Sequence, residues 1–464
     1  MKYLSIITII LMSCQLSASE ITGKWFGLLN IQGTKLGLVI NIEEKEGVMV
    51  GTLDSPDQGA YGIPATKLDF SNPNLNFEIS NIGVSYSGIL KDGKVEGIFK
   101  QAGMEIPLSL SREEIKKEIP KRPQEPKPPF PYKAEDVKFY NEIDDITLAG
   151  TLTMPENGDN FPVVVMITGS GAQNRDEELL DHKPFLVISD YLTRNGIAVL
   201  RFDDRGYGES EGNHAVATSY DFSTDVQSAV KFLKSRKEIN PKKIGLIGHS
   251  EGGVIAPIVA TTIPEDIAYM VLLAGTGIRG DKLLLLQQEL IYKSMSIPDE
   301  QIDAVISSNK VVFELITSSE DDKKLPDIIK NKISENVENN PELIPAGLDK
   351  DSYIEMQTRG IISPWLIAFM RLEPTDYLKH VKCPVFALNG EKDLQVPPKE
   401  NLSAIENSIK SNGNNNVTVK EYPNLNHLFQ NCETGSPNEY GEIEETFSPL
   451  VLKDIADWIN KVTN

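Results

Sequence analysis

The side chain best placed to do chemistry is Ser250, which lies in a Gly-x-Ser-x-Gly motif at residues 248–252. An apolar run at 244–247 precedes the motif and another at 254–260 follows it, which predicts a buried strand, a sharp turn and a helix. Such a turn holds the serine in a strained conformation, and side chains in place of the two glycines would collide with the neighbouring strand and helix. The pattern predicts a serine nucleophile; a purely structural turn is the competing interpretation.

A serine nucleophile needs a base that takes its proton and an acid that orients the base. His427 follows a predicted strand at 417–422 and is the expected base. Asp393 comes after the apolar run 385–388, in a Gly-x-x-Asp turn, which places a carboxylate at the carboxyl end of a sheet. The chain order serine, aspartate, histidine is one that known triads use. An ordinary turn aspartate that caps the next helix is the alternative for Asp393, and Glu391 is the rival acid.

The sequence contains only five histidines, so few residues compete for the role of base. His249, inside the motif, is expected to pack beside the serine. His182 and His214 fall on predicted loops near the rim of the site, where they are candidates for substrate contact or solvated side chains. His380 precedes a strand at the opposite end of the sheet and is expected at the surface.

The oxyanion formed by attack on a carbonyl needs two backbone N–H donors. Glu251 should supply one, because it follows the nucleophile at the start of the predicted helix, where N–H groups lack partners. Ser170 or Gly171 should supply the other from the loop after the apolar strand 161–168. The Glu251 carboxylate, if it is ionised, should also disfavour anionic acyl groups.

Predicted strands and helices alternate from about Asp136 onward, which predicts a mostly parallel sheet covered by helices on both faces. The predicted strands are 137–141, 146–154, 161–168, 197–202, 243–247, 267–274, 384–388 and 417–422. The predicted helices of this region are 183–195, 220–236, the run after Ser250 and 450–462. Such a sheet would bring the ends of its strands, and the candidate residues on them, to one edge.

Three further regions complete the domain organisation. Residues 20–115 show short segments of β-type alternation, which predict a small all-β domain. We interpret it as a barrel or sandwich that packs on the catalytic unit, with a binding module for substrate or cell surface as the alternative. Residues 116–133 form a linker with six prolines. Within the catalytic region 134–464, residues 278–380 replace the alternation by helices at 281–291, 299–318, 325–336 and 365–370. We interpret this insertion as a helical cap over the site, with a separate domain as the alternative.

These segments resemble the α/β-hydrolase fold from about Asp136 to the C-terminus, excepting the cap. The closer resemblance is to bacterial serine esterases of the dienelactone-hydrolase and serine-aminopeptidase-like branch that carry an N-terminal β domain. The motifs behind it are TGSGAQNRD at 168–176, LRFDDRGYGES at 200–210, GHSEG at 248–252, NGEKD at 389–393 and NH at 426–427. The resemblance implies a structural role for Arg205 through ion pairs. Thr168-Gly169 replaces the His-Gly of common lipases and no triple glycine follows, which disfavours bulky tertiary-alcohol esters.

Charge and the N-terminus bear on location. The formal net charge of −21 argues against nucleic acid or an anionic membrane surface as partner. Residues 1–19 combine a lysine, an apolar run and a small-residue cleavage site, which predicts a signal peptide and export; the run is too short for a stable membrane span. A lipoprotein anchored through Cys14 is the alternative. The other two cysteines, Cys383 and Cys432, could form a disulfide after export. We expect Cys383 to be a buried free thiol instead, because it begins an apolar strand.

The sequence therefore predicts an exported serine hydrolase that cleaves short-chain, aryl or acetyl carboxylic esters through an acyl-enzyme, without metal or organic cofactor. A thioesterase, an acyltransferase or a peptidase would use the same three side chains. A non-catalytic binding protein on a hydrolase fold is the alternative from another class. The natural substrate and the oligomeric state stay open.

Overall fold

The computed structural model describes residues 20–31, 34–45, 47–56, 60–101, 104–114, 121–341, 344 and 349–464. The chain divides into two compact units, one with the residues before Pro120 and Lys330–Thr358, the other with Pro120–Ile329 and Arg359–Asn464. The predicted signal peptide and the first residues of the predicted linker lie outside the described residues. In the part that is described, no helix has both the length and the apolar character needed to cross a membrane.

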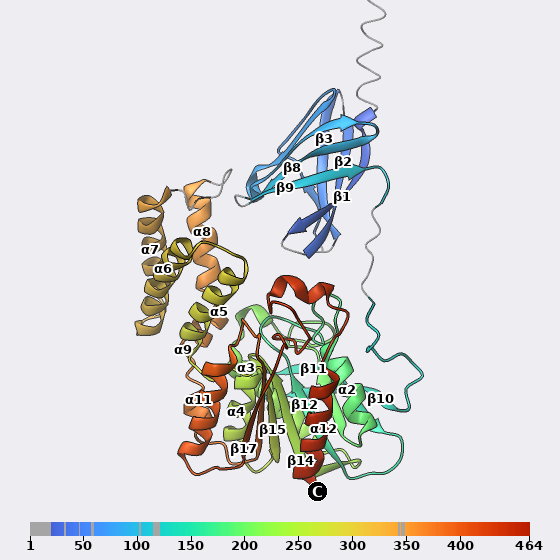
Figure 1. Ribbon diagram of the computed structural model, residues 1–464, viewed down its shortest axis with the longest axis vertical. Coiled ribbons are helices and arrows are strands. Elements are labelled where there is room, and N and C mark those ends of the chain that lie inside the picture. The colour runs from blue at the N-terminus through green and yellow to red at the C-terminus, as the bar shows by residue number, and fades with distance from the viewer. Residues whose placement is uncertain are drawn as a thin grey trace, which may run out of the picture. The chain divides into compact units, whose positions relative to one another are not determined.

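The first unit contains a nine-stranded antiparallel sheet in the order β4-β3-β2-β1-β9-β8-β7-β6-β5 (Figure 1). Its strands are β1 (Gly23–Ile31), β2 (Thr34–Lys45), β3 (Val48–Ser55), β4 (Ala60–Pro64), β5 (Lys67–Ser71), β6 (Asn74–Ile79), β7 (Val84–Lys91), β8 (Lys94–Gln101) and β9 (Met104–Ser111). Alternate side chains such as Leu75 and Phe77 of β6 are buried with Trp25 and Tyr86 in one apolar core. The β-type alternation thus builds an all-β structure with its own core.

The second unit contains an eight-stranded sheet in the order β10-β11-β13-β12-β14-β15-β16-β17. Its strands are β10 (Tyr132–Asn141), β11 (Ile146–Pro155), β12 (Phe161–Ile167), β13 (Ala198–Phe202), β14 (Ile239–His249), β15 (Tyr269–Leu273), β16 (Val385–Gly390) and β17 (Val417–Tyr422). β10 and β11 are antiparallel to their neighbours, whereas the six strands from β13 to β17 pair in parallel. The carboxyl ends of these six strands therefore share one edge.

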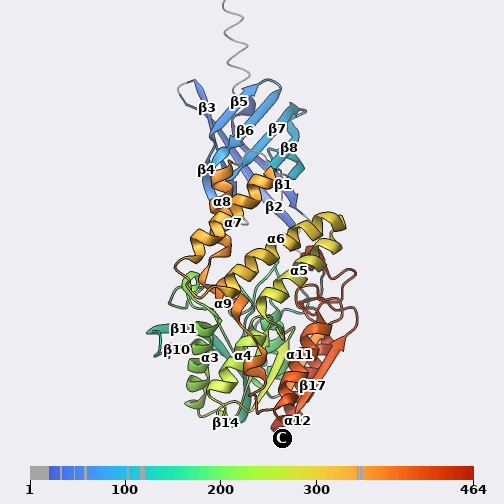
Figure 2. The same cartoon turned by 90° about the vertical axis from the view of Figure 1, so that its left-hand side faces the viewer.

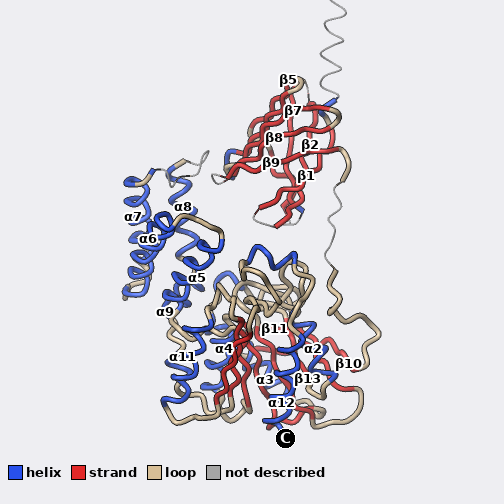
Figure 3. The backbone as a smooth tube through the Cα atoms, in the orientation of Figure 1, coloured by secondary structure: helices blue, strands red, loops and turns tan. Residues whose placement is uncertain are grey.

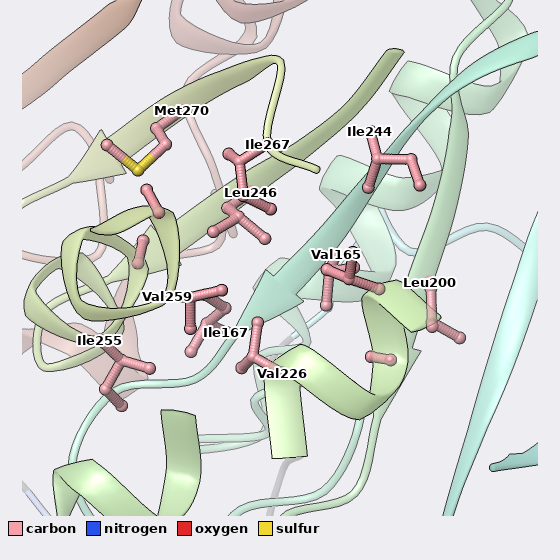
Figure 4. Close-up of a cluster of buried hydrophobic side chains, with 14 of the residues drawn as sticks. Val165, Ile167, Leu200, Val226, Ile244, Leu246, Ile255, Val259, Ile267 and Met270 are labelled. Carbon is pink, nitrogen blue, oxygen red and sulfur yellow. The ribbon is translucent and has the colours of Figure 1, made fainter. Parts of the chain in front are cut away.

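Helices cover both faces of this sheet (Figure 3). They are α2 (Pro184–Arg194) and α12 (Pro449–Thr463) on one face, and α3 (Ser219–Lys234), α4 (Gly252–Thr262) and α11 (Pro398–Ser411) on the other. The strands are apolar on both sides: Val165 packs toward α3 and α4, whereas Val164 packs toward α2 and α12. Figure 4 shows Val226 of α3 and Ile255 of α4 against the sheet. This architecture is the α/β-hydrolase fold that the alternation and motifs predicted.

Between β15 and β16 the described residues form helices and no strand. They are α5 (Gly280–Ser294), α6 (Asp299–Ser318), α7 (Leu325–Asn339), α8 (Lys350–Ile361), α9 (Pro364–Arg371) and α10 (Thr375–Leu378). Within the second unit, α5, α6 and α9 pack on one another, and Figure 2 shows α5 and α9 beyond the carboxyl ends of the strands. The sequence predicted helices at α5, α6, α7 and α9 but neither α8 nor α10. Lys330–Thr358 belongs to the first compact unit and not to the one that holds the sheet edge.

Part of the proline-rich segment is attached to the second unit. The guanidinium of Arg122 donates to the carbonyl oxygens of Leu180, Gly441 and Ile443 at 3.1, 2.8 and 2.7 Å. The Gln124 side chain bonds the backbone of the same C-terminal region. Although the composition indicated an extended tether, these polar side chains between the prolines fix residues 122–124 on the α/β unit.

Candidate active site

Ser250 lies on a strained turn between β14 and α4. Its φ is +53°, in the left-handed region that costs free energy for residues with a Cβ atom. The flanking glycines are needed because a Cβ atom at Gly248 would lie 2.0 Å from the carbonyl oxygen of Gly252. A Cβ atom at Gly252 would lie 2.2 Å from the carbonyl oxygen of Ile167. The turn therefore presents Ser250 at the carboxyl edge of the sheet, with the first turn of α4 directly behind it.

The two partner residues come from the loops after β16 and β17. His427 Nδ1 lies 2.8 Å from Asp393 Oδ2, and both side chains are buried. Asp393 Oδ1 accepts the N–H groups of Gln395 and Val396 at 2.8 and 2.9 Å, which fixes the carboxylate. Since the carboxylate accepts from Nδ1, the Nε2 lone pair of neutral His427 is available as a base. No described residue bonds this Nε2 atom or the Ser250 hydroxyl, so both remain uncommitted.

The predicted oxyanion donors lie beside this turn. A Cβ atom at Gly169 would be 3.3 Å from that of Ser250, so the loop after β12 runs along the nucleophile. The N–H of Gly169 already donates to Glu177. In contrast, no acceptor among the described residues takes the N–H of Ser170, Gly171 or Glu251. These three amides are therefore unoccupied among the described residues, and their role as oxyanion donors stays a prediction.

Asp204 holds both ends of this oxyanion loop. Its Oδ1 atom is 2.7 Å from the Thr168 hydroxyl and its Oδ2 atom accepts the Gln173 N–H at 2.8 Å. Burial raises the pKa of Asp204 to about 8, and the charges of Glu177 and Glu251 add to the rise. In the sequence, Asp204 stands out only as part of the motif at 200–210. The signal was present, because it follows a buried strand at the active edge of the sheet.

Glu251 connects the nucleophile turn to the helical insertion. Its carboxylate is buried and accepts from the Ser219 hydroxyl at 2.6 Å and from Trp365 Nε1 of α9 at 2.8 and 2.9 Å. Burial raises its pKa, opposed by these two hydrogen bonds. Trp365 stacks on Phe369 at 5.4 Å, in an apolar cluster of α5, α9 and the loop after Asp393. Apolar side chains therefore lie next to both the nucleophile and the acid.

Charged loops behind the site are held by ion pairs. Arg175 bonds Asp203, and Arg205 bonds both Asp225 and Asp144, at 2.7 Å in each case. Arg205 is buried among these partners. Its structural role is the one that the resemblance implied.

His182 is not at the rim of the site, contrary to the prediction. It is fully buried, with Nδ1 2.9 Å from the Thr446 hydroxyl and Nε2 2.9 Å from the Tyr440 carbonyl oxygen. Burial lowers its pKa to about 4, so it is neutral near pH 7. The sequence placed it on a loop but gave no sign that residues 437–446 fold over that loop. A buried, neutral His182 is a structural residue.

The surroundings of His214 and His380 differ, and substrate contact by His214 stays a prediction. His214 is half-buried, stacks on Phe222 at 4.8 Å and lines a cavity of about 20 Å³ below Gly169. His380 is exposed, as expected. Cys383 and Cys432 are both free thiols, and burial raises the pKa of Cys383 to about 12. Nowhere in the described ranges do three or more metal-ligating side chains gather.

The chain matches the family model described as serine aminopeptidase, S33, over residues 184–433, which is more than half of its length. It belongs to this family of α/β-hydrolases. The matched segment runs from α2 to the loop after β17 and includes the serine, aspartate and histidine described above. The loop after β12, which carries Ser170 and Gly171, lies before the matched segment.

One relative of this S33 chain with broad coverage is named an esterase. Esterase EstD of Thermotoga maritima is 24% identical over 327 residues, covering 69% of this chain and 68% of EstD. Thiohydrolase aneE of Aspergillus aculeatus is 34% identical over 133 residues, but covers only 27% of this chain and 38% of its own. Among solved structures, the Pyrococcus furiosus esterase Pf2001 is 16% identical, covers 75% of this chain and all of its own, and has a TM-score of 0.43. The chain is an esterase-type hydrolase.

Proposed function

We propose that this protein is an exported serine esterase in which Ser250, His427 and Asp393 form the triad. One observation carries the proposal. The Asp393–His427 hydrogen bond of 2.8 Å leaves Nε2 as the free base, while the strained turn presents an uncommitted serine beside unused backbone N–H groups. A nucleophile, an oriented base and oxyanion donors together are what acyl transfer requires.

The reaction follows from this geometry. When the substrate binds, His427 Nε2 takes the Ser250 hydroxyl proton and the serine oxygen attacks the ester carbonyl. The N–H of Glu251 and that of Ser170 or Gly171 hold the oxyanion, and Asp393 stabilises the imidazolium. Nε2 then protonates the leaving alcohol. Water, deprotonated by the same nitrogen, releases the acid from the acyl-enzyme.

The surroundings of the triad favour uncharged acyl groups of modest size. Leu283, Phe369 and Val396 form a buried apolar cluster with Trp365, and Val396 donates its N–H to Asp393. An anionic acyl group would be desolvated in this environment close to Glu251, which costs free energy. We therefore keep short-chain, aryl or acetyl carboxylic esters as the proposed substrates, including acetyl esters on carbohydrate.

Hydrolysis of a p-nitrophenyl ester series from acetate to palmitate tests the proposal. The mature protein should be most active on short chains, and Ser250→Ala should lower kcat by more than about a thousandfold, as expected for loss of a triad nucleophile. Ser235→Ala, at an exposed serine on the last turn of α3, is the matched control and should be unchanged. Turnover that survives in Ser250→Ala would refute the assignment of the nucleophile.

A thioester substrate is the second candidate, because relatives over part of the chain are named a thiohydrolase and a polyketide transferase. The same triad would act, with a thiol as leaving group. If no ester is turned over while a fluorophosphonate still labels Ser250, the triad stands and acyl-thioesters or peptides become the substrates to try. Absence of labelling would indicate a binding protein instead.

We also propose export, on the basis of residues 1–19. Mass spectrometry of the mature protein from its native cell decides between two forms. Cleavage after Ser19 leaves an unmodified chain, whereas a lipid on Cys14 marks the anchored alternative. An intact Met1 end on the cytoplasmic side would contradict both.

A further inference from the structure

One buried acid–base pair touches all three segments that build the proposed site. Glu177 Oε1 accepts the N–H of Gly169, on the oxyanion loop, at 2.8 Å. The same oxygen lies 2.9 Å from Nδ1 of His249, the residue before the nucleophile. His249 Nε2 is in turn 3.1 Å from the carbonyl oxygen of His427. Both side chains of the pair are buried, at 4% and 7% exposure.

The partners of His249 determine how many protons its ring carries. The carbonyl oxygen of His427 can only accept, so Nε2 must hold a proton. Glu177 Oε1 already accepts an amide N–H, which identifies it as an acceptor oxygen, so Nδ1 must hold a proton as well. A ring with protons on both nitrogens is an imidazolium, and the Glu177 carboxylate is its counter-ion.

The charges around His249 are consistent with this count. Burial alone would lower the pKa of His249, but the Glu177 carboxylate, 2.9 Å away, more than offsets burial and raises it. The other titratable groups facing the ring are His427, whose ring centroid is 4.7 Å away, and Asp393, which also favours the charged form. A buried cation is tolerated when it is paired and fully hydrogen-bonded, as here.

We infer that His249 is a permanently protonated positioning residue, which with Glu177 holds the oxyanion loop, the nucleophile turn and the backbone of the catalytic base in register. The inference rests on the proposed triad, because the relative positions of these three segments affect catalysis only if Ser250, His427 and the oxyanion loop act on the same substrate. His249 does not touch substrate. It acts through the carbonyl of His427 and, by way of Glu177, through the amide of Gly169.

His182 provides a reference inside the same molecule. It is equally buried, but the Thr446 hydroxyl beside its Nδ1 atom can donate as well as accept, so a single ring proton satisfies it. Burial lowers its pKa to about 4, the opposite direction from His249. Near pH 7 the two buried histidines should therefore differ by one proton.

The first test is ¹⁵N NMR of the mature, histidine-labelled protein between pH 6 and 9, with signals assigned through His249→Gln and His182→Gln. His249 should keep protons on both ring nitrogens throughout this range, whereas His182 should keep one. Five histidines make the spectrum tractable. A singly protonated His249 ring at neutral pH overturns the inference, and the result does not depend on whether any ester is hydrolysed.

The second test is kinetic. His249→Gln can donate toward Glu177 or toward the His427 carbonyl but not both, and Glu177→Gln removes the counter-ion. Because misplacement by about 1 Å costs about a hundredfold in rate, we expect kcat to fall ten- to a hundredfold in each variant while KM changes less than threefold. Fluorophosphonate labelling of Ser250 should slow by the same factor. His380→Gln, at an exposed site, is the matched control.

The outcomes separate this inference from the proposed function. Unchanged kcat in His249→Gln, with an active parent enzyme, overturns the positioning role and leaves the triad in place. A parent that neither hydrolyses esters nor reacts with fluorophosphonate refutes the triad, and the NMR proton count still decides the charge on His249. If His249→Gln does not fold, Glu177→Gln and the spectrum of the parent decide.

Discussion

A single methyl group added at Gly252 should impair catalysis while the protein still folds. In Gly252→Ala the new Cβ atom would lie 2.2 Å from the carbonyl oxygen of Ile167 and 2.8 Å from that of Thr168. Ordinary contacts begin at 3.4 Å, so α4 and the end of β12 must separate by 1.2 Å, the difference between 3.4 and 2.2 Å. That separation falls between Ser250 and the loop that carries Ser170.

The size of the effect follows from this displacement. A shift of about 1 Å between a nucleophile and its oxyanion donors costs about a hundredfold in rate, so kcat/KM should fall about a hundredfold. Overpacking costs about 1–3 kcal/mol of unfolding free energy, and the better helix propensity of alanine in the first turn of α4 returns about 0.5–1 kcal/mol. The fold should survive, with a net loss of stability below about 3 kcal/mol.

The assay compares p-nitrophenyl acetate hydrolysis and urea unfolding for Gly252→Ala and Gly360→Ala. No heavy atom lies within 4 Å of a Cβ atom at Gly360, in α8, so that variant should be fully active and stabilised by a few tenths to about 1 kcal/mol. Activity of Gly252→Ala within threefold of the parent would refute the argument that close approach of the turn to β12 aligns the oxyanion donors.

Two further variants probe the buried carboxylates. Asp204 has a folded pKa of about 8, above its unfolded value, so its stabilisation is complete at low pH and is lost as pH rises through 8. Asp204→Asn mimics the protonated form and should flatten the fall in unfolding free energy between about pH 4 and 8, the range between the unfolded and folded pKa values; an unchanged slope contradicts this. Trp365→Phe keeps the stack on Phe369 but removes the indole donor to Glu251, which should cost about 1.5–3 kcal/mol in urea unfolding. A loss below about 0.5 kcal/mol would show that the Trp365 bond is replaced by water.

The sequence was most informative where apolar periodicity and glycine spacing act locally. The run 244–247 and the motif around Ser250 predicted a strand, a turn and a helix, and the structure has β14, the strained turn and α4 in that order. Because parallel strands end at one edge, the same reasoning brought Asp393 and His427 to neighbouring loops, where they form a hydrogen bond of 2.8 Å. Local signals thus predicted the fold class and the elements that carry the site.

Contacts between distant segments could not be predicted in the same way. His182 was taken for a loop residue because nothing near it in the chain shows that Tyr440 and Thr446 cover it. The polar helix α8 carries few apolar residues, so periodicity did not reveal it. Likewise the bonds that attach Arg122 to the loops at Leu180 and Gly441 join residues far apart in the sequence. The failures at His182 and Arg122 concern what covers a residue, whereas the failure at α8 concerns a helix whose apolar periodicity is weak.

The buried ionisable groups around the nucleophile show why this distinction matters for function. In the sequence, Glu177 and Asp204 look like ordinary charged loop residues, because charges are usually solvated. Among the described residues neither has an arginine or lysine partner; instead they bond His249, Thr168 and backbone amides of the loop after β12. Charges that only stabilised the loops could pair with arginines, as Asp203 and Asp225 do with Arg175 and Arg205. Glu177 instead bonds the His249 ring and the Gly169 amide, and Asp204 bonds the Thr168 hydroxyl and the Gln173 amide, so we expect both carboxylates to hold the loop beside Ser250 in place. The kinetics of Glu177→Gln measure this role.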